Sequence, residues 1–236
     1  MQQLFALLER SKGLKNASGF DGAEAAIAAI ARGDFVVVVD DESRENEGDL
    51  IVAADAITPQ AVGFMLRYTS GLVCVALPGE VLDRLWLPPM VRDNHESFET
   101  AFTVSVDLRC GVSTGISATD RAATLRALAD PASAAGDFVR PGHVFPLRAK
   151  PGGVLERPGH TEAANDLVQL AGRSPGGVLC ELVDGNGEML RRPGLLQFAR
   201  AHRLVITTIA QLIAHRRATA SAQRQETPEA SGKVSP

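Results

Sequence analysis

The run Phe35-Val-Val-Val-Val39 constrains the fold of this chain more than any other stretch of the sequence. It is too short for a buried helix, and its β-branched residues favour a strand that is buried on both faces. The alanine-rich residues 21–32 directly before it place Ile27 and Ile30 at helical spacing, and Gly33 ends this helix. These residues predict a helix that leads directly into the interior of a sheet.

Strand and helix patterns interleave along the rest of the chain, but several strands are too close together for repeated βαβ units. Residues 101–108 alternate apolar and polar side chains, which predicts a strand with one solvent-exposed face. We therefore expect an α+β fold, a single domain with a mixed β-sheet covered by helices. The other expected strands are 48–54, 72–77, 143–149, 178–183 and 204–207, and the other expected helices are 59–68, 117–130, 161–172, 194–202 and one that ends near Arg217.

Composition divides the 236 residues into one folded unit and two ends. Residues 18–217 contain no long linker and form the predicted domain, while residues 1–17 are an N-terminal extension. From Ala218 to Pro236 the chain is polar and almost free of large apolar residues. We therefore predict a disordered C-terminal tail over residues 218–236.

Charge and cysteine usage exclude several classes of protein. The net charge of −4 gives no basic field for nucleic acid or an anionic membrane, and no apolar run approaches the ~20 residues of a membrane helix. Residues 1–15 lack a signal-peptide pattern. The widely spaced Cys74, Cys110 and Cys180 form no Cys-x-x-Cys pair, which indicates free thiols and no zinc ribbon. We expect a soluble cytoplasmic protein.

An acidic segment, residues 40–49, follows the first strand and holds six carboxylates. Two unit charges 4 Å apart repel by about 4 kcal/mol at an effective dielectric of 20, so such a density favours a counter-charge. Mg²⁺ prefers carboxylate oxygens and shares its shell with substrate oxygens. Arg44 could pair with an anionic ligand, and Gly48 permits a turn that folds Glu45 and Asp49 together. A solvated acidic loop is the alternative.

The tetrapeptide Arg-Pro-Gly-His occurs twice, at residues 140–143 and 157–160. Each copy predicts a rigid turn that presents an arginine together with a histidine. Arginine matches phosphate with a planar fork of donors, and histidine can ligate a metal or move protons near neutral pH. Thr161 follows the second copy at an expected helix start, where backbone N–H groups also favour phosphate. His143 and His160 are thus candidate site residues.

Two further positions bear on catalysis. Glu181 lies in the apolar strand 178–183, where burial would suit a proton-transfer role near neutral pH. An outward-facing strand residue is the alternative. Ser113 and Thr114 precede Gly115 and could donate hydrogen bonds to phosphate, or they could be ordinary turn residues.

Four blocks of sequence in one order carry a resemblance to a known family. They are Asp40-Asp-Glu-Ser-Arg-Glu-Asn-Glu-Gly-Asp49, Gly115-Ile-Ser-Ala-Thr-Asp-Arg121, Arg140-Pro-Gly-His-Val-Phe-Pro-Leu-Arg148 and Gly159-His-Thr-Glu-Ala163. Together they resemble the signature of 3,4-dihydroxy-2-butanone 4-phosphate synthase over roughly residues 18–217. The resemblance implies an Mg²⁺-dependent lyase of riboflavin biosynthesis, with Mn²⁺ as a possible substitute. Its reaction converts D-ribulose 5-phosphate to L-3,4-dihydroxy-2-butanone 4-phosphate and formate, through enolisation, dehydration and skeletal rearrangement.

The resemblance also assigns roles to individual residues. It places the metal ligands at Glu45 and His160, and the positions essential for catalysis at His143 and Glu181. Asp49 is a candidate for removal of the first proton. The implied substrate-binding positions are Arg44, Glu45, Asp49, Arg157, Pro158, Gly159, His160, Thr161 and Glu181.

The family forms homodimers with active sites near the dimer interface, so we expect a homodimer here. Many relatives carry a fused GTP cyclohydrolase II domain with a cysteine-ligated zinc; this sequence lacks that cysteine spacing, and we expect a monofunctional enzyme. Pro158 stands where the family usually has a small residue, and residues 95–99 depart from its commoner Thr/Ser/Gly pattern.

Two other functions compete with this one. A magnesium-dependent phosphosugar aldolase or phosphatase would need a Schiff-base lysine or a phosphoryl-accepting aspartate, and Lys150 is the only lysine between Lys15 and Lys233. A catalytically lapsed relative that only binds metal and sugar phosphate is the second alternative. Every matched catalytic position is intact, which favours the synthase.

Overall fold

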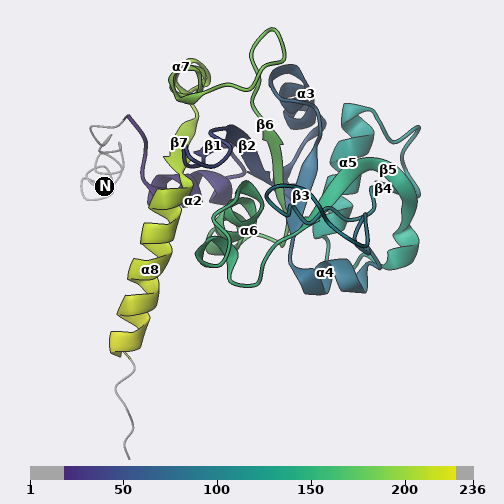
Figure 1. The fold of residues 1–236 in the computed structure, drawn as a ribbon. Coiled ribbons are helices and arrows are strands. Elements are labelled where there is room, and N and C mark those ends of the chain that lie inside the picture. Colours follow the sequence, from purple (N-terminus) through teal and green to yellow (C-terminus); the bar gives the residue numbers. More distant parts are fainter. Residues whose placement is uncertain (1–18, 227–236) are drawn as a thin grey trace, which may run out of the picture.

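The computed structural model describes residues 19–226, and the expected N-terminal extension, residues 1–17, lies outside this range. Within it the chain forms one mixed sheet with the strand order β4-β5-β3-β6-β2-β1-β7 (Figure 1). Parallel pairs join β1 to β7 and β3 to β5, and the other neighbours are antiparallel. The predicted mixed sheet is therefore confirmed. The strands are β1 (Val36–Val39), β2 (Gly48–Ala53), β3 (Cys74–Leu77), β4 (Val106–Leu108), β5 (Phe138–Arg148), β6 (Gly177–Glu181) and β7 (Val205–Thr208).

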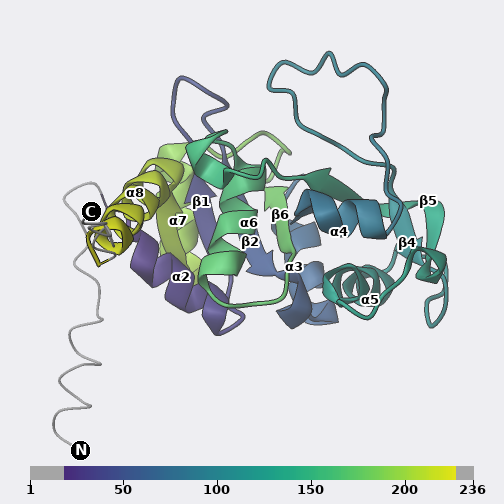
Figure 2. The same ribbon diagram turned by 90° about the horizontal axis from the view of Figure 1, so that it is seen from below.

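Two hydrophobic clusters show that helices cover both faces of this sheet. All four valines of β1 are buried, and alternate members join opposite clusters, as expected for a strand between two layers. Figures 1 and 2 show the helices arranged around the sheet. Helices α2 (Ala23–Ala31), α6 (His160–Leu170) and α8 (Ile209–Glu226) pack into one cluster, and α3 (Pro59–Tyr68), α4 (Gly79–Arg84), α5 (Ala118–Ala129) and α7 (Arg192–His202) into the other.

Helix boundaries follow local capping chemistry. The side chain of Ser117 accepts the backbone N–H of Asp120, which confirms the predicted cap of α5. Thr58 caps α3 in the same way through the N–H of Ala61, and Pro59 occupies the first turn, where its missing N–H costs little. No helix within residues 19–226 is long and apolar enough to cross a membrane.

Two predictions of local structure were wrong. Only Val106–Leu108 of the segment 101–108 forms a strand, and Thr103, Ser105 and Asp107 are buried, so the segment has no solvent-exposed face. Isolated bridges from this segment to Leu147 and Pro89 explain the burial, because it is packed on both sides. Residues 218–226 continue helix α8 instead of being disordered, and residues 227–236 lie outside the described part of the chain.

One end of the sheet gathers the segments that carried the sequence motifs. The acidic loop (residues 40–47) connects β1 to β2 there, and the first turn of α6 lies against it. The longer loop between α4 and β4 projects from the same side of the molecule, as Figure 2 shows. This end of the sheet therefore positions the candidate site.

Candidate active site

A cavity of about 250 Å³ opens where β2 begins and β6 ends. Asp49 and Glu181 are directly opposite each other on these two strands, so their side chains project from the same face of the sheet. The acidic loop and the start of α6 form the other walls. Most of the predicted site residues line this cavity: Arg44, Glu45, Asp49, Arg157, His160, Thr161 and Glu181.

Asp40 organises the acidic loop. Its Oδ2 accepts the backbone N–H of Glu45 at 3.0 Å and a guanidinium N–H of Arg44 at 3.1 Å. Its Oδ1 accepts the backbone N–H of Glu47 at 2.9 Å. The loop is therefore folded around a buried carboxylate and is not solvated along its whole length, which argues against the alternative of an ordinary acidic loop.

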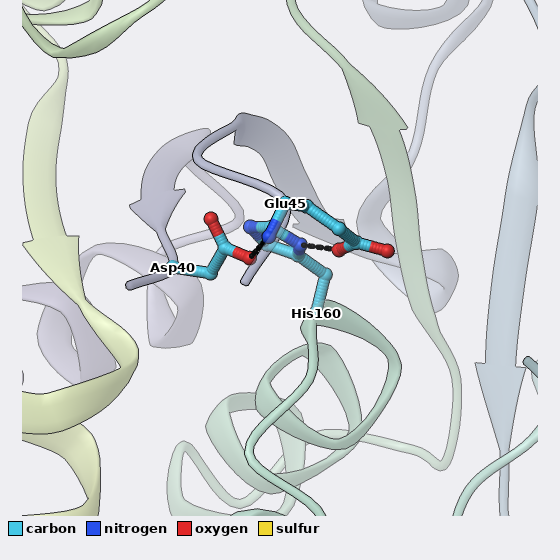
Figure 3. Close-up of side chains that lie close together, drawn as sticks. All are labelled: Asp40, Glu45 and His160. Carbon is cyan, nitrogen blue, oxygen red and sulfur yellow. Dashed lines mark hydrogen bonds and ion pairs between the residues drawn. The ribbon is translucent and has the colours of Figure 1, made fainter. Parts of the chain in front are cut away.

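Asp40, Glu45 and His160 form a group that could hold a metal ion (Figure 3). One ligand atom from each lies within 4.8 Å of the others. Nδ1 of His160 lies 3.4 Å from Oε2 of Glu45 and 3.8 Å from Oδ1 of Asp49. Sequence reasoning identified Glu45 and His160 but assigned no role to Asp40, although it lies in the acidic segment.

The charges at this site favour a cation. Burial lowers the pKa of His160, but the charges of Asp49, Asp40 and Glu45 outweigh burial and raise this pKa to about 9. Burial raises the pKa of Asp49 to about 8, and Glu181 and Glu45 add to this rise while His160 opposes it. Without a metal, bound protons on these groups offset the negative charge of the clustered carboxylates. A divalent cation would offset the same negative charge in their place.

Two buried atoms at this site lack partners among the described residues. They are Oδ1 of Asp49 and Nε2 of His160. A buried polar atom without a hydrogen bond costs about 1–3 kcal/mol, so native proteins rarely leave one unpaired. A carboxylate oxygen and an imidazole nitrogen are both ligands for divalent metals. The residues present therefore fit a bound cation or a ligand oxygen.

Arg157 joins the start of α6 to the loop between α4 and β4. Its Nη1 donates to Glu162 at 2.6 Å, and its Nη2 donates to the carbonyl oxygen of Phe98 at 2.9 Å and to Thr100 Oγ1 at 3.2 Å. The guanidinium of Arg44 lies over the ring of Phe98, 4.8 Å from its centre. Phe98 therefore contacts both arginines at the mouth of the cavity, and no sequence motif pointed to it.

Pro158 and Gly159 do not line the cavity, although Arg157 and His160 on either side of them do. Pro158 lines a separate cavity on the other side of the acidic loop, with residues of β1, α7 and α8. Gly159 is the N-cap of α6, and a side chain there would meet Nη1 of Arg157 at 2.4 Å. Gly159 therefore lies beside the end of the Arg157 side chain at the start of α6, whereas Pro158 lies away from the cavity.

Glu181 is fixed by the segment that follows α3. Ser70 Oγ donates to Oε2 of Glu181 at 2.5 Å, and the backbone N–H of Ser70 donates to the carbonyl oxygen of Glu181 at 2.8 Å. Nothing in the sequence around Ser70 suggested this contact, because it joins residues far apart in the chain.

His143 does not line the cavity. It lies in the middle of β5, two residues before Phe145, which is aligned with Cys74 and Leu179 across three strands. His143 itself lies in the part of β5 where the pairing with β4 shifts register, and its backbone N–H bonds to the carboxylate of Asp107 instead of to a neighbouring strand. The imidazole of His143 contacts Asp107, which sequence reasoning had placed in a half-exposed strand.

The two Arg-Pro-Gly-His copies are not equivalent. The second leads into α6 and places Arg157 and His160 at the cavity. The first lies within β5, and the guanidinium of Arg140 donates to the carbonyl oxygens of Leu85, Ala135 and Phe138. Arg140 therefore has a structural role, and the prediction that each copy forms a rigid turn presenting an arginine together with a histidine was wrong for the first copy.

The fold and the site together define a class: a mixed-sheet α+β protein in which carboxylates and a histidine that could hold a cation lie beside an arginine-lined cavity. Residues 24–215 match the family model of 3,4-dihydroxy-2-butanone 4-phosphate synthase. A protein of that name from Agrobacterium fabrum is 58% identical over 192 residues, which cover 81% of this chain and 90% of the relative. The chain belongs to the 3,4-dihydroxy-2-butanone 4-phosphate synthase family.

Longer relatives and solved structures agree with this assignment. The riboflavin biosynthesis protein RibBA of Salinispora arenicola is 59% identical over 200 residues, 85% of this chain but 48% of the relative, so the chain spans about half of its length. A crystal structure of 3,4-dihydroxy-2-butanone 4-phosphate synthase in complex with two magnesium ions matches with a TM-score of 0.82 and 46% identity, covering 85% of this chain and 99% of that one. The Candida albicans enzyme matches with a TM-score of 0.78, 48% identity and coverage of 83% and 97%.

Proposed function

We propose that this protein converts D-ribulose 5-phosphate to L-3,4-dihydroxy-2-butanone 4-phosphate and formate in riboflavin biosynthesis. The observation that carries the proposal is the meeting of Glu45, His160 and Asp49 beside Glu181 in one cavity, with Asp49 Oδ1 and His160 Nε2 left unpartnered. These are the residue types that metal-assisted enolisation of a sugar phosphate requires. Membership of the family supports the same reaction.

Glu45 and His160 would hold a divalent cation, Mg²⁺ or alternatively Mn²⁺, with Asp40 close enough to contribute. When bound, the cation supplies polarisation of the substrate's carbonyl and hydroxyl oxygens, which lowers the cost of an enediolate. A magnesium ligand set with few protein groups leaves room for substrate oxygens. The related structure that contains two magnesium ions supports Mg²⁺ as the cation.

Asp49 is the proposed base for the first proton. It is buried and lines the cavity, and its Oδ1 accepts no hydrogen bond from the described residues; a nearby positive charge would lower its raised pKa toward the range of a working base. Glu181 lies directly opposite and would move protons in the later steps, oriented by Ser70. His143, which lies outside the cavity and whose imidazole side chain is 41% exposed, would take part in the same later steps.

Arg157, Thr161 and the N-terminus of α6 would bind the phosphate. Backbone N–H groups at a helix start favour anions, and an arginine fork matches phosphate oxygens. Arg157 donates to the carbonyl oxygen of Phe98 in this structure, so a phosphate that takes those donors would release the Phe98 segment to adjust over the substrate. Arg44 on the acidic loop would approach the substrate from the opposite wall.

We further propose a cytoplasmic homodimer, on the strength of the family resemblance. Analytical ultracentrifugation of the purified protein would give a mass near 50 kDa for a dimer, about twice the 25.0 kDa of one chain. A mass equal to one chain at working concentrations would contradict it.

The test of the reaction is formate release from ribulose 5-phosphate with magnesium and then with chelator. Formate that appears only with metal supports the proposal. Absence of formate from folded, metal-loaded protein would favour the lapsed relative that binds without catalysis. Formation of two smaller carbonyl compounds or of inorganic phosphate would instead indicate the aldolase or the phosphatase.

A further inference from the structure

His143 and Asp107 form a two-point contact outside the cavity. Nδ1 of His143 lies 2.7 Å from Oδ2 of Asp107, and the backbone N–H of His143 donates to Oδ1 of the same carboxylate at 2.9 Å. The imidazole side chain is 41% exposed, whereas Asp107 as a residue is only 5% exposed. One buried carboxylate therefore holds both the backbone and the ring of His143.

The surroundings of Asp107 are shaped around this contact. A side chain on Gly115 would meet Oδ2 of Asp107 at 2.0 Å and Nδ1 of His143 at 2.9 Å, so the carboxylate and the ring occupy space that only glycine leaves free. Arg121 is buried on the first turns of α5. Burial lowers the pKa of Arg121, and the negative charge of Asp107 acts in the opposite direction, so the two charges interact.

This geometry selects one form of the histidine ring. An ionised carboxylate only accepts hydrogen bonds, so Nδ1 must carry a proton to bond with Oδ2. In the neutral ring the lone pair is then on Nε2, on the side of the ring away from Asp107. The nitrogen that is free to accept a proton is thereby fixed by a residue that touches neither the cavity nor the metal group.

We propose that Asp107 is a positioning residue for the reaction: it holds His143 with Nδ1 protonated and Nε2 available for proton transfer. This inference rests on the proposed function, because it assumes that His143 takes part in catalysis. Asp107 itself would not touch the substrate.

Asp107→Asn tests the proposal sharply because asparagine has nearly the same shape. The backbone N–H of His143 would claim the amide oxygen, and the amide NH₂ would then face Nδ1 as a donor. To accept a hydrogen bond from this NH₂ group, Nδ1 of His143 must be unprotonated, so the proton of the neutral ring moves to Nε2. An orienting carboxylate replaced by an amide in this way costs a histidine base orders of magnitude in rate.

Two measurements separate this effect from loss of structure. ¹⁵N NMR of the His143 ring reports which nitrogen carries the proton, and formate release gives kcat and KM. We expect Nδ1–H in the parent protein and Nε2–H in Asp107→Asn, with kcat lowered by about a hundredfold or more and KM nearly unchanged. Ser105→Ala is the matched control, because Ser105 Oγ accepts the N–H of Gly142 in the same turn without touching the ring.

Retention of kcat within about threefold of the parent in Asp107→Asn would overturn the positioning role. An unchanged Nδ1–H form in that variant would overturn it as well, because the mechanism requires the proton to move. Equal loss of kcat in Ser105→Ala, with the ring form unaltered, would show that the turn and not the carboxylate matters. If the parent protein releases no formate, the proposed function fails, while the ring measurement still decides whether Asp107 sets the form of His143.

Discussion

Ser70 Oγ donates a hydrogen bond to Oε2 of Glu181 at 2.5 Å, and a second bond of 2.8 Å joins the Ser70 N–H to the Glu181 carbonyl oxygen. Ser70, two residues after the end of α3, is thereby attached to the last residue of β6. Both the backbone and the carboxylate of Glu181 are therefore held where the side chain lines the cavity. The precision of a proton-transfer group depends on such supports.

Ser70→Ala should lower the rate of formate release by about tenfold, since a lost hydrogen bond to a charged group is worth roughly 1.5–3 kcal/mol when buried and less at this exposed serine. The effect should appear mainly in kcat, with magnesium binding unchanged. Ser221→Ala is the control, because within the described part of the chain its hydroxyl bonds only the carbonyl oxygen of Arg217, on an exposed part of α8. Unaltered kinetics in Ser70→Ala would mean that Glu181 needs no such support.

Magnesium should stabilise the protein, and Glu45→Gln should abolish most of that effect. A ligand at a hundred times its Kd adds about 2.7 kcal/mol to the free energy of unfolding, which raises Tm by several degrees in a domain of this size. Glu42→Gln is the matched control in the same loop, because the Glu42 side chain is 70% exposed and pairs only with Arg192 at 3.5 Å. A thermal shift with and without chelator measures both. An equal magnesium shift in Glu45→Gln would remove this residue from the metal site.

The sequence predicted the centre of the fold better than its periphery. Four consecutive valines in β1 are best buried when the strand lies between two layers, and all four are buried in that arrangement in the structure. The segment 101–108 misled because its alternation continues while its polar residues, Thr103 and Asp107 among them, are buried by contacts from distant segments. Residues 218–226 are polar but rich in alanine and glutamine, which are strong helix formers, and they prolong α8 beyond the sheet (Figure 1).

The candidate site shows the same division between local and distant information. Asp49 and His160 were found because a charge cluster and a turn motif are visible within a few residues. Ser70 and Asp107 were missed because each contacts a partner far away in sequence, which only the tertiary fold brings close. Phe98 was missed for the same reason, since its contact with two arginines depends on how the loop between α4 and β4 lies over the cavity.

Asp120 should make the stability of the protein depend on acid pH. Hydrogen bonds from the side chain and N–H of Ser113, opposed by a smaller effect of burial and aided by Gly115, lower the pKa of Asp120 below its ordinary value. A carboxylate with a lowered folded-state pKa adds stability above its unfolded pKa, and this stability is lost as pH falls through the folded value. Asp120→Asn should therefore be less stable than the parent at pH 7.

The difference between Asp120→Asn and the parent should shrink below about pH 4, where the parent carboxyl also becomes protonated. Urea unfolding at pH 7, 5 and 3.5 measures it. Asp130→Asn serves as the control, because that exposed carboxylate accepts only the backbone N–H of Ala132. A gap between Asp120→Asn and the parent that stays constant with pH would show that shape, and not charge, makes Asp120 important.

Gly115 should tolerate no side chain, because a Cβ there would clash with Asp107 and His143. Gly111 is a control that separates this clash from the conformational cost of alanine. Gly115 and Gly111 both have left-handed backbones, with φ of +89° and +78°, so alanine at either position carries a similar conformational cost of about 1–2 kcal/mol. Only at Gly115 would the new Cβ meet Asp107 and His143, whereas nothing lies within 4 Å of it at Gly111. Gly111→Ala should lose stability alone, and Gly115→Ala should lose stability together with formate release. Equal activity in the two variants would mean that the Asp107 carboxylate can move aside without consequence for the reaction.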